Sequence, residues 1–276
     1  MKTDILLSTY NGTAFLEELL QSLSAQTFPD WRLLIRDDGS SDETMDILKS
    51  WQEKDKDRIF VVGDNKKHLG PKKSFEVLLT KSTAETIMFC DQDDFWLSHK
   101  IENTLAKMKQ LEQRYPGIPA LVFSDLTVAD KMLREVHSSF WEYINVDPDN
   151  VYNIYRLLIN NPVVGCTVMI NRKVKSLVLP FPEQAVMHDW WIALKVSQKG
   201  VMDYLPQPTI LYRLHNKNSI GASLADRKYY ASRFSNFSKT ISQNRNAIKM
   251  LRKLDFRLSF VRFLGYKIQV TLSKFL

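Results

Sequence analysis

Short apolar runs alternate with amphipathic stretches over the first hundred residues, and this alternation restricts the fold more than any other feature of the sequence. Apolar residues recur at helical spacing over 14–26 and 43–52, a long helix is expected over 97–115, and another helix is expected to open near Phe75. Strand-like runs lie at 4–8, 31–36, 59–62, 85–89, 120–125, 167–170 and 209–213. This order predicts an α/β protein with a mostly parallel sheet flanked by helices.

Carboxylates follow two of the predicted strands at the point where each strand ends. Asp37 and Asp38 come after the second strand, and Asp91 and Asp93 come after the fourth. Ligands of open α/β sheets bind at the carboxyl ends of the strands, and hard divalent cations take oxygen ligands. With the basic loop before Phe75, these positions fit a nucleoside diphosphate and its metal. The alternative is that the carboxylates only form acidic turns and helix caps.

Length and composition indicate a folded protein with a sizeable core. The chain has 276 residues, of which 44% are hydrophobic, which suits one large domain or one domain with an extension. Cys90 and Cys166 have neither disulfide-rich nor metal-ligand spacing, which favours a reducing cytosol. We expect no signal peptide and no membrane-spanning helix, because no sufficiently long apolar run occurs.

Positive charge is concentrated near the C-terminus. The net charge is +7, yet from residue 213 onward Lys and Arg outnumber Asp and Glu by 14 to two. We therefore divide the chain into a domain at 1–225 and a basic amphipathic helical extension at 226–276. Three interpretations of the extension remain open: contact with an anionic membrane surface, with a second subunit in a homodimer, or with its own domain.

A series of motifs resembles the signature of family 2 glycosyltransferases with the GT-A fold, the Rossmann-like fold of nucleotide-diphospho-sugar transferases. The motifs are Ser8-Thr9-Tyr10-Asn11-Gly12, Gln26-Thr27-Phe28, Asp37-Asp38-Gly39-Ser40-Ser41 and Asp91-Gln92-Asp93-Asp94-Phe95-Trp96. Later segments resemble bacterial rhamnosyltransferases that build cell-wall or capsular polysaccharide. These are Gly165-Cys166-Thr167, His188-Asp189-Trp190-Trp191 and Tyr212-Arg213-Leu214-His215.

The resemblance implies a site for the donor. Ser8, Thr9 and Tyr10 match the donor-binding turn of the family, and Asp38 matches the acceptor of the base N3–H. Asp91 and Asp93 match the Asp-x-Asp pair that contacts the ribose and a metal, Mn²⁺ or Mg²⁺. Lys73 is the candidate for a further phosphate contact. Its neighbours Lys66, Lys67 and Lys72 can replace it, and the default interpretation of all four is that they are solvated loop lysines.

The resemblance also implies an acceptor site with one catalytic base. Asp189 matches the general base of the family; the alternative is a first-turn aspartate that only interacts with the helix dipole. His188, Trp190 and Gly165 are candidate acceptor-binding residues, with packing in the rim as the alternative for His188. His215 is a candidate third metal ligand, or a phosphate contact, or a plain loop histidine. Residues 216–221 are a candidate lid.

Together these expectations describe an inverting, metal-dependent glycosyltransferase of bacterial surface polysaccharide synthesis. The favoured donor is dTDP-L-rhamnose, the acceptor a glycan or lipid-linked glycan, and a UDP-hexose is the alternative donor. The expected location is cytoplasmic, on the inner face of the membrane. A nucleotidyltransferase would carry a Gly-rich basic loop after its first strand, and residues 8–12 offer none. A membrane- or nucleic-acid-binding module would leave the acidic clusters without a purpose, so we expect no nucleic-acid partner.

Overall fold

The structure is a computed structural model that describes residues 2–63 and 68–215, together with residues 250, 253, 254, 262, 265, 266 and 269. Lys66 and Lys67, the candidate lid at 216–221 and most of the extension at 226–276 therefore lie outside the described residues. Among the described residues, no helix is long and apolar enough to span a membrane.

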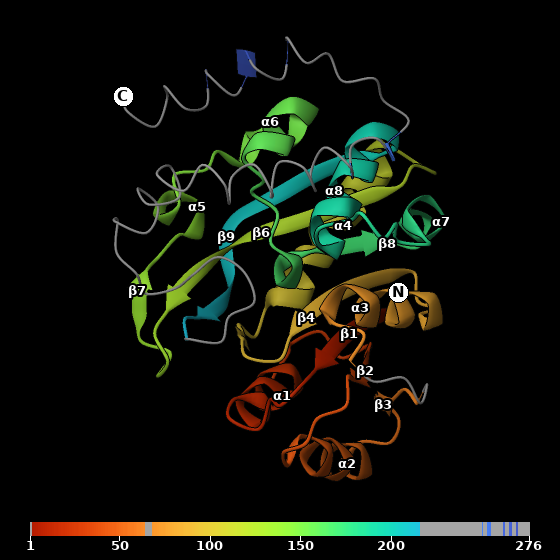
Figure 1. Ribbon diagram of the computed structural model, residues 1–276, viewed down its shortest axis with the longest axis vertical. Coiled ribbons are helices and arrows are strands. Elements are labelled where there is room, and N and C mark those ends of the chain that lie inside the picture. Colours follow the sequence, from red (N-terminus) through yellow and green to blue (C-terminus); the bar gives the residue numbers. More distant parts are fainter. Residues whose placement is uncertain are drawn as a thin grey trace.

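One sheet runs through the protein, as the sequence predicted (Figure 1). Its path is β3-β2-β1-β4-β8-β6-β9-β5, with β7 paired to β6. Strands β1, β2, β3 and β4 pair in parallel, β8 runs antiparallel to β4 and β6, and β9 returns parallel to β6. The strands are β1 Thr3–Thr9, β2 Trp31–Asp37, β3 Ile59–Val61, β4 Thr86–Asp91, β5 Phe95–Trp96, β6 Ala120–Ala129, β7 Glu135–His137, β8 Met169–Asn171 and β9 Val201–Arg213.

Helices cover both faces of the sheet. The helices are α1 Leu16–Ser24, α2 Thr44–Lys54, α3 Pro71–Lys81, α4 Lys100–Arg114, α5 Phe140–Tyr143, α6 Ile154–Ile159, α7 Lys173–Val178 and α8 His188–Lys199, with 3-10 turns at Pro148–Tyr152 and Gly165–Thr167. Helices α1 and α4 pack on one face and α3 and α8 on the other, which gives two hydrophobic clusters. Successive residues of β1 point to opposite clusters, because side chains alternate along a strand: Leu6 to one, Ile5 and Leu7 to the other.

The second half of the chain differs from the predicted elements in two places. The predicted helix at 97–115 begins later, at Lys100, because Phe95 and Trp96 pair with Leu211 and Ile210 as β5. The strand predicted at 209–213 is the last part of a longer strand, β9.

Described positions of the extension contact the domain itself. Met250 and Leu254 are buried in the cluster that also holds helix α8. The ring of Tyr266 stacks on Tyr155 at a centroid distance of 5.4 Å, and its hydroxyl accepts a hydrogen bond from Asn153. At these positions the extension therefore packs on its own domain, one of the three interpretations left open by the sequence.

Candidate active site

The loops after β1, β2 and β4 meet at one edge of the sheet. In the parallel register Thr9 lies opposite Asp37, and Ser8 lies opposite Asp91. Because parallel strands end at the same edge, the polar residues that follow them gather there. This edge holds the predicted donor-binding residues.

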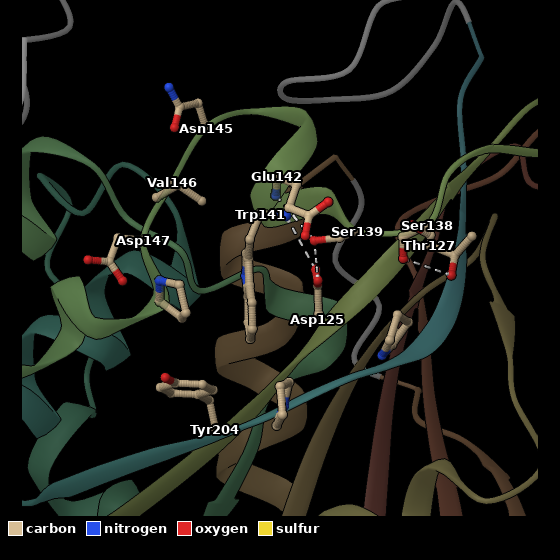
Figure 2. Close-up of a pocket in the computed structure, with 13 residues that line it drawn as sticks. Asp125, Thr127, Ser138, Ser139, Trp141, Glu142, Asn145, Val146, Asp147 and Tyr204 are labelled. Carbon is tan, nitrogen blue, oxygen red and sulfur yellow. Dashed lines mark hydrogen bonds between the residues drawn. The ribbon is translucent and has the colours of Figure 1, made fainter. Parts of the chain in front are cut away.

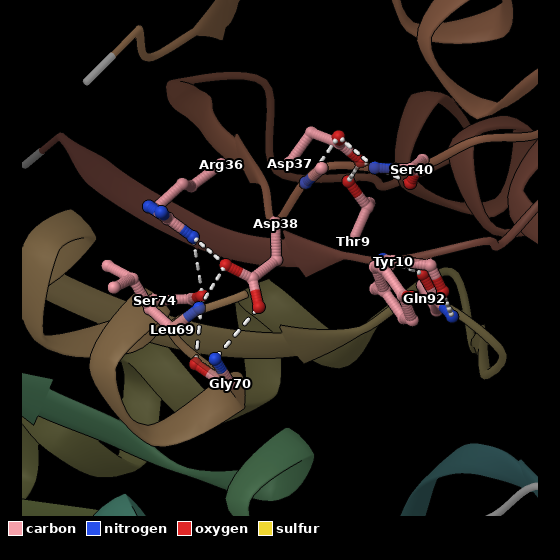
Figure 3. A network of polar contacts seen from close by, with 11 residues as sticks. Thr9, Tyr10, Arg36, Asp37, Asp38, Ser40, Leu69, Gly70, Ser74 and Gln92 are labelled. Carbon is pink, nitrogen blue, oxygen red and sulfur yellow. Dashed lines mark hydrogen bonds and ion pairs between the residues drawn. The ribbon is translucent and has the colours of Figure 1, made fainter. Parts of the chain in front are cut away.

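Asp38 is buried and held by a dense set of donors (Figure 3). Its carboxylate pairs with Arg36 at 2.7 Å and accepts the backbone N–H groups of Leu69 and Gly70, each at 2.8 Å. Burial alone would raise the pKa of Asp38, but the guanidinium of Arg36 and the two N–H groups outweigh it and lower the pKa. The carboxylate is thus ionised and rigidly placed, and it has lone pairs left for another donor.

Asp37, the neighbouring carboxylate, serves the turn. It accepts hydrogen bonds from the Thr9 hydroxyl at 2.9 Å and from the backbone N–H groups of Gly39 and Ser40. The Thr9 side chain is therefore buried and directed at Asp37, while Tyr10 is 48% exposed and its ring meets His68 edge-on. Of the predicted donor-binding turn, Tyr10 offers the accessible side chain.

Three carboxylates crowd the end of β4. Oxygens of Asp91 and Asp94 and the sulfur of Cys166 lie within 4.8 Å of one another. Burial raises the pKa of Asp91 to about 7, and the negative charges of Asp93 and Asp189 add to this effect. Burial, followed by the charges of Asp93 and Asp91, also raises the pKa of Asp94 well above its usual range. The ammonium group of Lys100, also buried, interacts with Asp94 and Cys166.

Asp93 lies against His215. The Nε2 atom of His215 lies 2.7 Å from a carboxylate oxygen of Asp93. Arg213 supports this contact, since its Nε donates to the Asp93 carbonyl oxygen while its guanidinium lies over the Phe15 ring and pairs with Glu18. The structure therefore brings two predicted metal ligands together.

The donor set fits a divalent cation. Carboxylate oxygens, such as those of the neighbouring Asp91 and Asp94, are suitable ligands for Mn²⁺ or Mg²⁺. Among the described residues, neither carboxylate oxygen of Asp94 has a hydrogen-bond partner of normal geometry, although both are buried. A buried carboxylate in that state is costly unless a cation compensates it. Asp94 is thus a candidate ligand that the sequence analysis missed.

Asp189 lies in the first turn of α8 and is fixed by the main chain. The N–H of Gly165 donates to its Oδ2 at 3.0 Å, and the N–H of Trp190 lies 2.7 Å from its Oδ1. Because its charge contributes to the raised pKa of Asp91, the predicted base faces the acidic cluster. The indole N–H of Trp190 has no partner among the described residues.

His188 packs beneath this carboxylate and leaves little of its ring accessible. It is 2% exposed, and its ring lies 4.1 Å from that of Phe75 and 5.1 Å from that of Phe89 between centroids. Burial lowers its pKa. A Cβ at Gly165 would lie 2.9 Å from His188 Nε2, so glycine is required for this close approach. In this structure His188 therefore packs in the rim.

The lysines near α3 are engaged with protein groups. Lys73 pairs with Glu76 at 2.5 Å on the same helix and is 43% exposed. Lys72 donates to the carbonyl oxygens of Glu183 and Ala185 at 2.8 and 2.7 Å, so it ties α3 to the loop that precedes α8. Lys73 must leave Glu76 to reach a phosphate.

The aromatic-rich segment at 138–161 contributes to the hydrophobic core and forms one wall of a cavity. This cavity, of about 700 Å³, lies between β6, α5 and β9 (Figure 2). Trp141 is buried there and donates to the Pro162 carbonyl, and the Tyr204 ring meets it edge-on. Asp125 caps α5 by accepting from the N–H groups of Phe140 and Trp141. Its carboxylate is therefore structural.

Comparisons with known proteins agree with this architecture. Residues 4–176 match the family model "Glycosyl transferase family 2". The chain is 26% identical over 235 residues to "dTDP-rhamnosyl transferase RfbG" of Shigella flexneri, covering 81% of this chain and 76% of the relative. It is 28% identical over 222 residues to "Putative teichuronic acid biosynthesis glycosyltransferase TuaG" of Bacillus subtilis, covering 79% and 81%.

Two solved structures share the fold. Staphylococcus aureus TarS 1-349 in complex with UDP-GlcNAc superimposes with a TM-score of 0.61 at 19% identity, and the chain spans 62% of its length. The Pyrobaculum calidifontis mannosyltransferase PcManGT, in complex with GDP-Man and Mn²⁺, has a TM-score of 0.60 at 16% identity, with 98% of this chain and 80% of that chain covered. With the family model covering more than half of its residues, the chain belongs to glycosyl transferase family 2 and is a glycosyltransferase.

Proposed function

We propose that this enzyme transfers a sugar, with inversion, from a nucleoside diphosphate donor to a glycan or lipid-linked glycan hydroxyl of a bacterial surface polysaccharide. One observation carries the proposal: the ionised Asp38, the acidic cluster around Asp91 and the fixed carboxylate of Asp189 lie on one rim. The first suits a nucleobase, the second a cation with its diphosphate, and the third a hydroxyl proton.

The favoured donor is dTDP-L-rhamnose. The relative from Shigella flexneri supports this choice, whereas the TarS complex supports a UDP-linked sugar. Thymine and uracil both carry an imide N–H, and the Asp38 carboxylate accepts from either. Tyr10, with its exposed ring, and Ser8 complete the base and ribose side, and Lys73 is the proposed additional phosphate contact after it leaves Glu76.

A divalent cation would be held by Asp91, Asp93 and His215, with Asp94, which lies close to Asp91, as a further candidate ligand. Bound there, it supplies positive charge that stabilises the diphosphate leaving group. The chain's own part is to place the ligands: Arg213 fixes the Asp93 backbone, and the His215 ring already lies against the Asp93 carboxylate in the metal-free protein.

Asp189 is the proposed general base. A single displacement requires only one base, opposite the leaving group, to take the acceptor hydroxyl's proton. The Gly165 N–H holds the carboxylate in place, and His188 packs beside Gly165. The buried indole N–H of Trp190, which has no partner among the described residues, is the proposed donor to an acceptor oxygen. We also propose that the extension at 226–276 brings the enzyme to the anionic inner face of the membrane.

The test is release of nucleotide from a panel of dTDP- and UDP-sugars with Mn²⁺, Mg²⁺ or EDTA. We expect one donor to be turned over, and both Asp93→Asn and Asp189→Asn to lose at least about 100-fold in rate. Asp46→Asn, at an exposed position on α2, is the matched control. Near-normal turnover in both site variants would contradict the proposed roles of Asp93 and Asp189.

A further inference from the structure

Gln92, between Asp91 and Asp93, holds the main chain of Tyr10 with both ends of its side-chain amide. Its Oε1 accepts the Tyr10 N–H at 2.9 Å, and its Nε2 donates to the Tyr10 carbonyl oxygen at 3.1 Å (Figure 3). The pairing of β1 with β4 ends at Ser8 and Asp91. The amide therefore adds one more pair of strand-like hydrogen bonds beyond the ladder, and ties the loop after β1 to the loop after β4.

Gly12 leaves the space that this amide fills. A Cβ at Gly12 would lie 2.5 Å from Oε1 and 2.8 Å from Cδ of Gln92. Its backbone does not adopt the left-handed conformation that favours glycine, so conformation alone does not require this residue. Residues of two segments about 80 residues apart in the sequence therefore both contribute to this contact: Gln92 supplies the amide, and Gly12 supplies the space for it.

We propose that Gln92 is a positioning residue for the donor: it sets Asp91 and Asp93 at a fixed place relative to Tyr10. Within the described part of the chain the amide binds main-chain atoms of Tyr10, which leaves the Tyr10 ring and both carboxylates available to the ligand. The inference rests on the proposed function, because it assigns a nucleoside diphosphate to this rim. The contact bridges two loops at a partly exposed edge, so its loss affects ligand binding more than folding.

The first test replaces the amide with an isosteric apolar side chain. Gln92→Met removes both hydrogen bonds, and we expect the Kd for dTDP or UDP in the presence of Mn²⁺ to rise about tenfold by calorimetry. Its Tm should stay within about 2 °C of the wild type. Gln21→Met, at an exposed position on α1, is the matched control and should leave the Kd unchanged.

The second test displaces the amide without changing Gln92. Gly12→Ala should weaken nucleotide binding about tenfold in the wild type, but less than twofold in a Gln92→Ala background, because the clashing group is then absent. Wild-type affinity in Gln92→Met, or full additivity in the double variant, would refute the positioning role. A wild-type protein that binds neither nucleotide would instead overturn the proposed function, and this inference with it.

Discussion

Replacement of Gly165 by alanine tests whether the exact position of the Asp189 carboxylate controls turnover. The new Cβ would lie 2.9 Å from Nε2 and 3.2 Å from Cε1 of His188, and 3.4 Å from Oδ2 of Asp189. The imidazole cannot retreat easily, because Phe75 and Phe89 pack against it in the core. The clash must therefore shift the backbone N–H that holds Asp189, or the carboxylate itself.

The expected effect is mainly on kcat. Overpacking of this kind costs about 1–3 kcal/mol of stability, and a base misplaced by about 1 Å loses about 100-fold in rate. We expect kcat to fall about 100-fold at saturating donor, with the donor KM within about twofold of wild type, because the Asp38 side of the rim is untouched. Steady-state nucleotide release and a thermal melt measure the two quantities.

Substitutions at two further glycines distinguish a misplaced base from a general loss of stability. Gly63→Ala places its Cβ in open space and should change neither kcat nor Tm. Gly200→Ala drives its Cβ to 2.3 Å from the Pro119 carbonyl oxygen, so it should lower Tm while the folded enzyme keeps its kcat. A Gly165→Ala enzyme with kcat within threefold of wild type would refute the argument that this N–H positions the base.

Three other perturbations follow from the site. Because the pKa of Asp91 is raised to about 7, the metal-free protein loses stability as the pH rises towards that value and the carboxyl group ionises. The ionised group is the form that binds a cation, so Mn²⁺ should raise Tm more at pH 8 than at pH 6. The pKa of Asp38 is lowered, so its contribution is present above about pH 4 and lost below. In Asp38→Asn, the free energy of unfolding in urea should therefore depend less on pH around pH 4. At pH 7 this variant should also lose about 3 kcal/mol of unfolding free energy, because the buried Arg36 no longer has its ion pair. Lys72→Met should lower kcat about threefold to tenfold by releasing the loop before Asp189, with loop proteolysis as a second measurement.

Local periodicity was sufficient for the strands that are central and continuous. In β1 the central residues Ile5, Leu6 and Leu7 are consecutive apolar residues, because both faces of a parallel sheet are covered. Strand β5 escaped prediction because it has only two residues and forms by pairing with β9, more than a hundred residues away. Strand β9 was predicted too short because Pro206 and Pro208 interrupt its pattern, and the register with β6 shifts at that point.

The sequence was sufficient to predict which polar residues lie at the strand ends that form the rim. It was not sufficient to predict the direction in which each of their side chains points. Four adjacent residues take four environments: Asp91 faces Asp189, Gln92 binds the Tyr10 backbone, Asp93 meets His215 and Asp94 is buried. Sequence spacing cannot assign these directions, since they depend on partners brought in by β1, α8 and β9. The same reasoning explains why Gln92 and Asp94 escaped prediction. Gln92 binds Tyr10 and Asp94 lies beside Cys166, and only the folded sheet brings these distant sequence segments together.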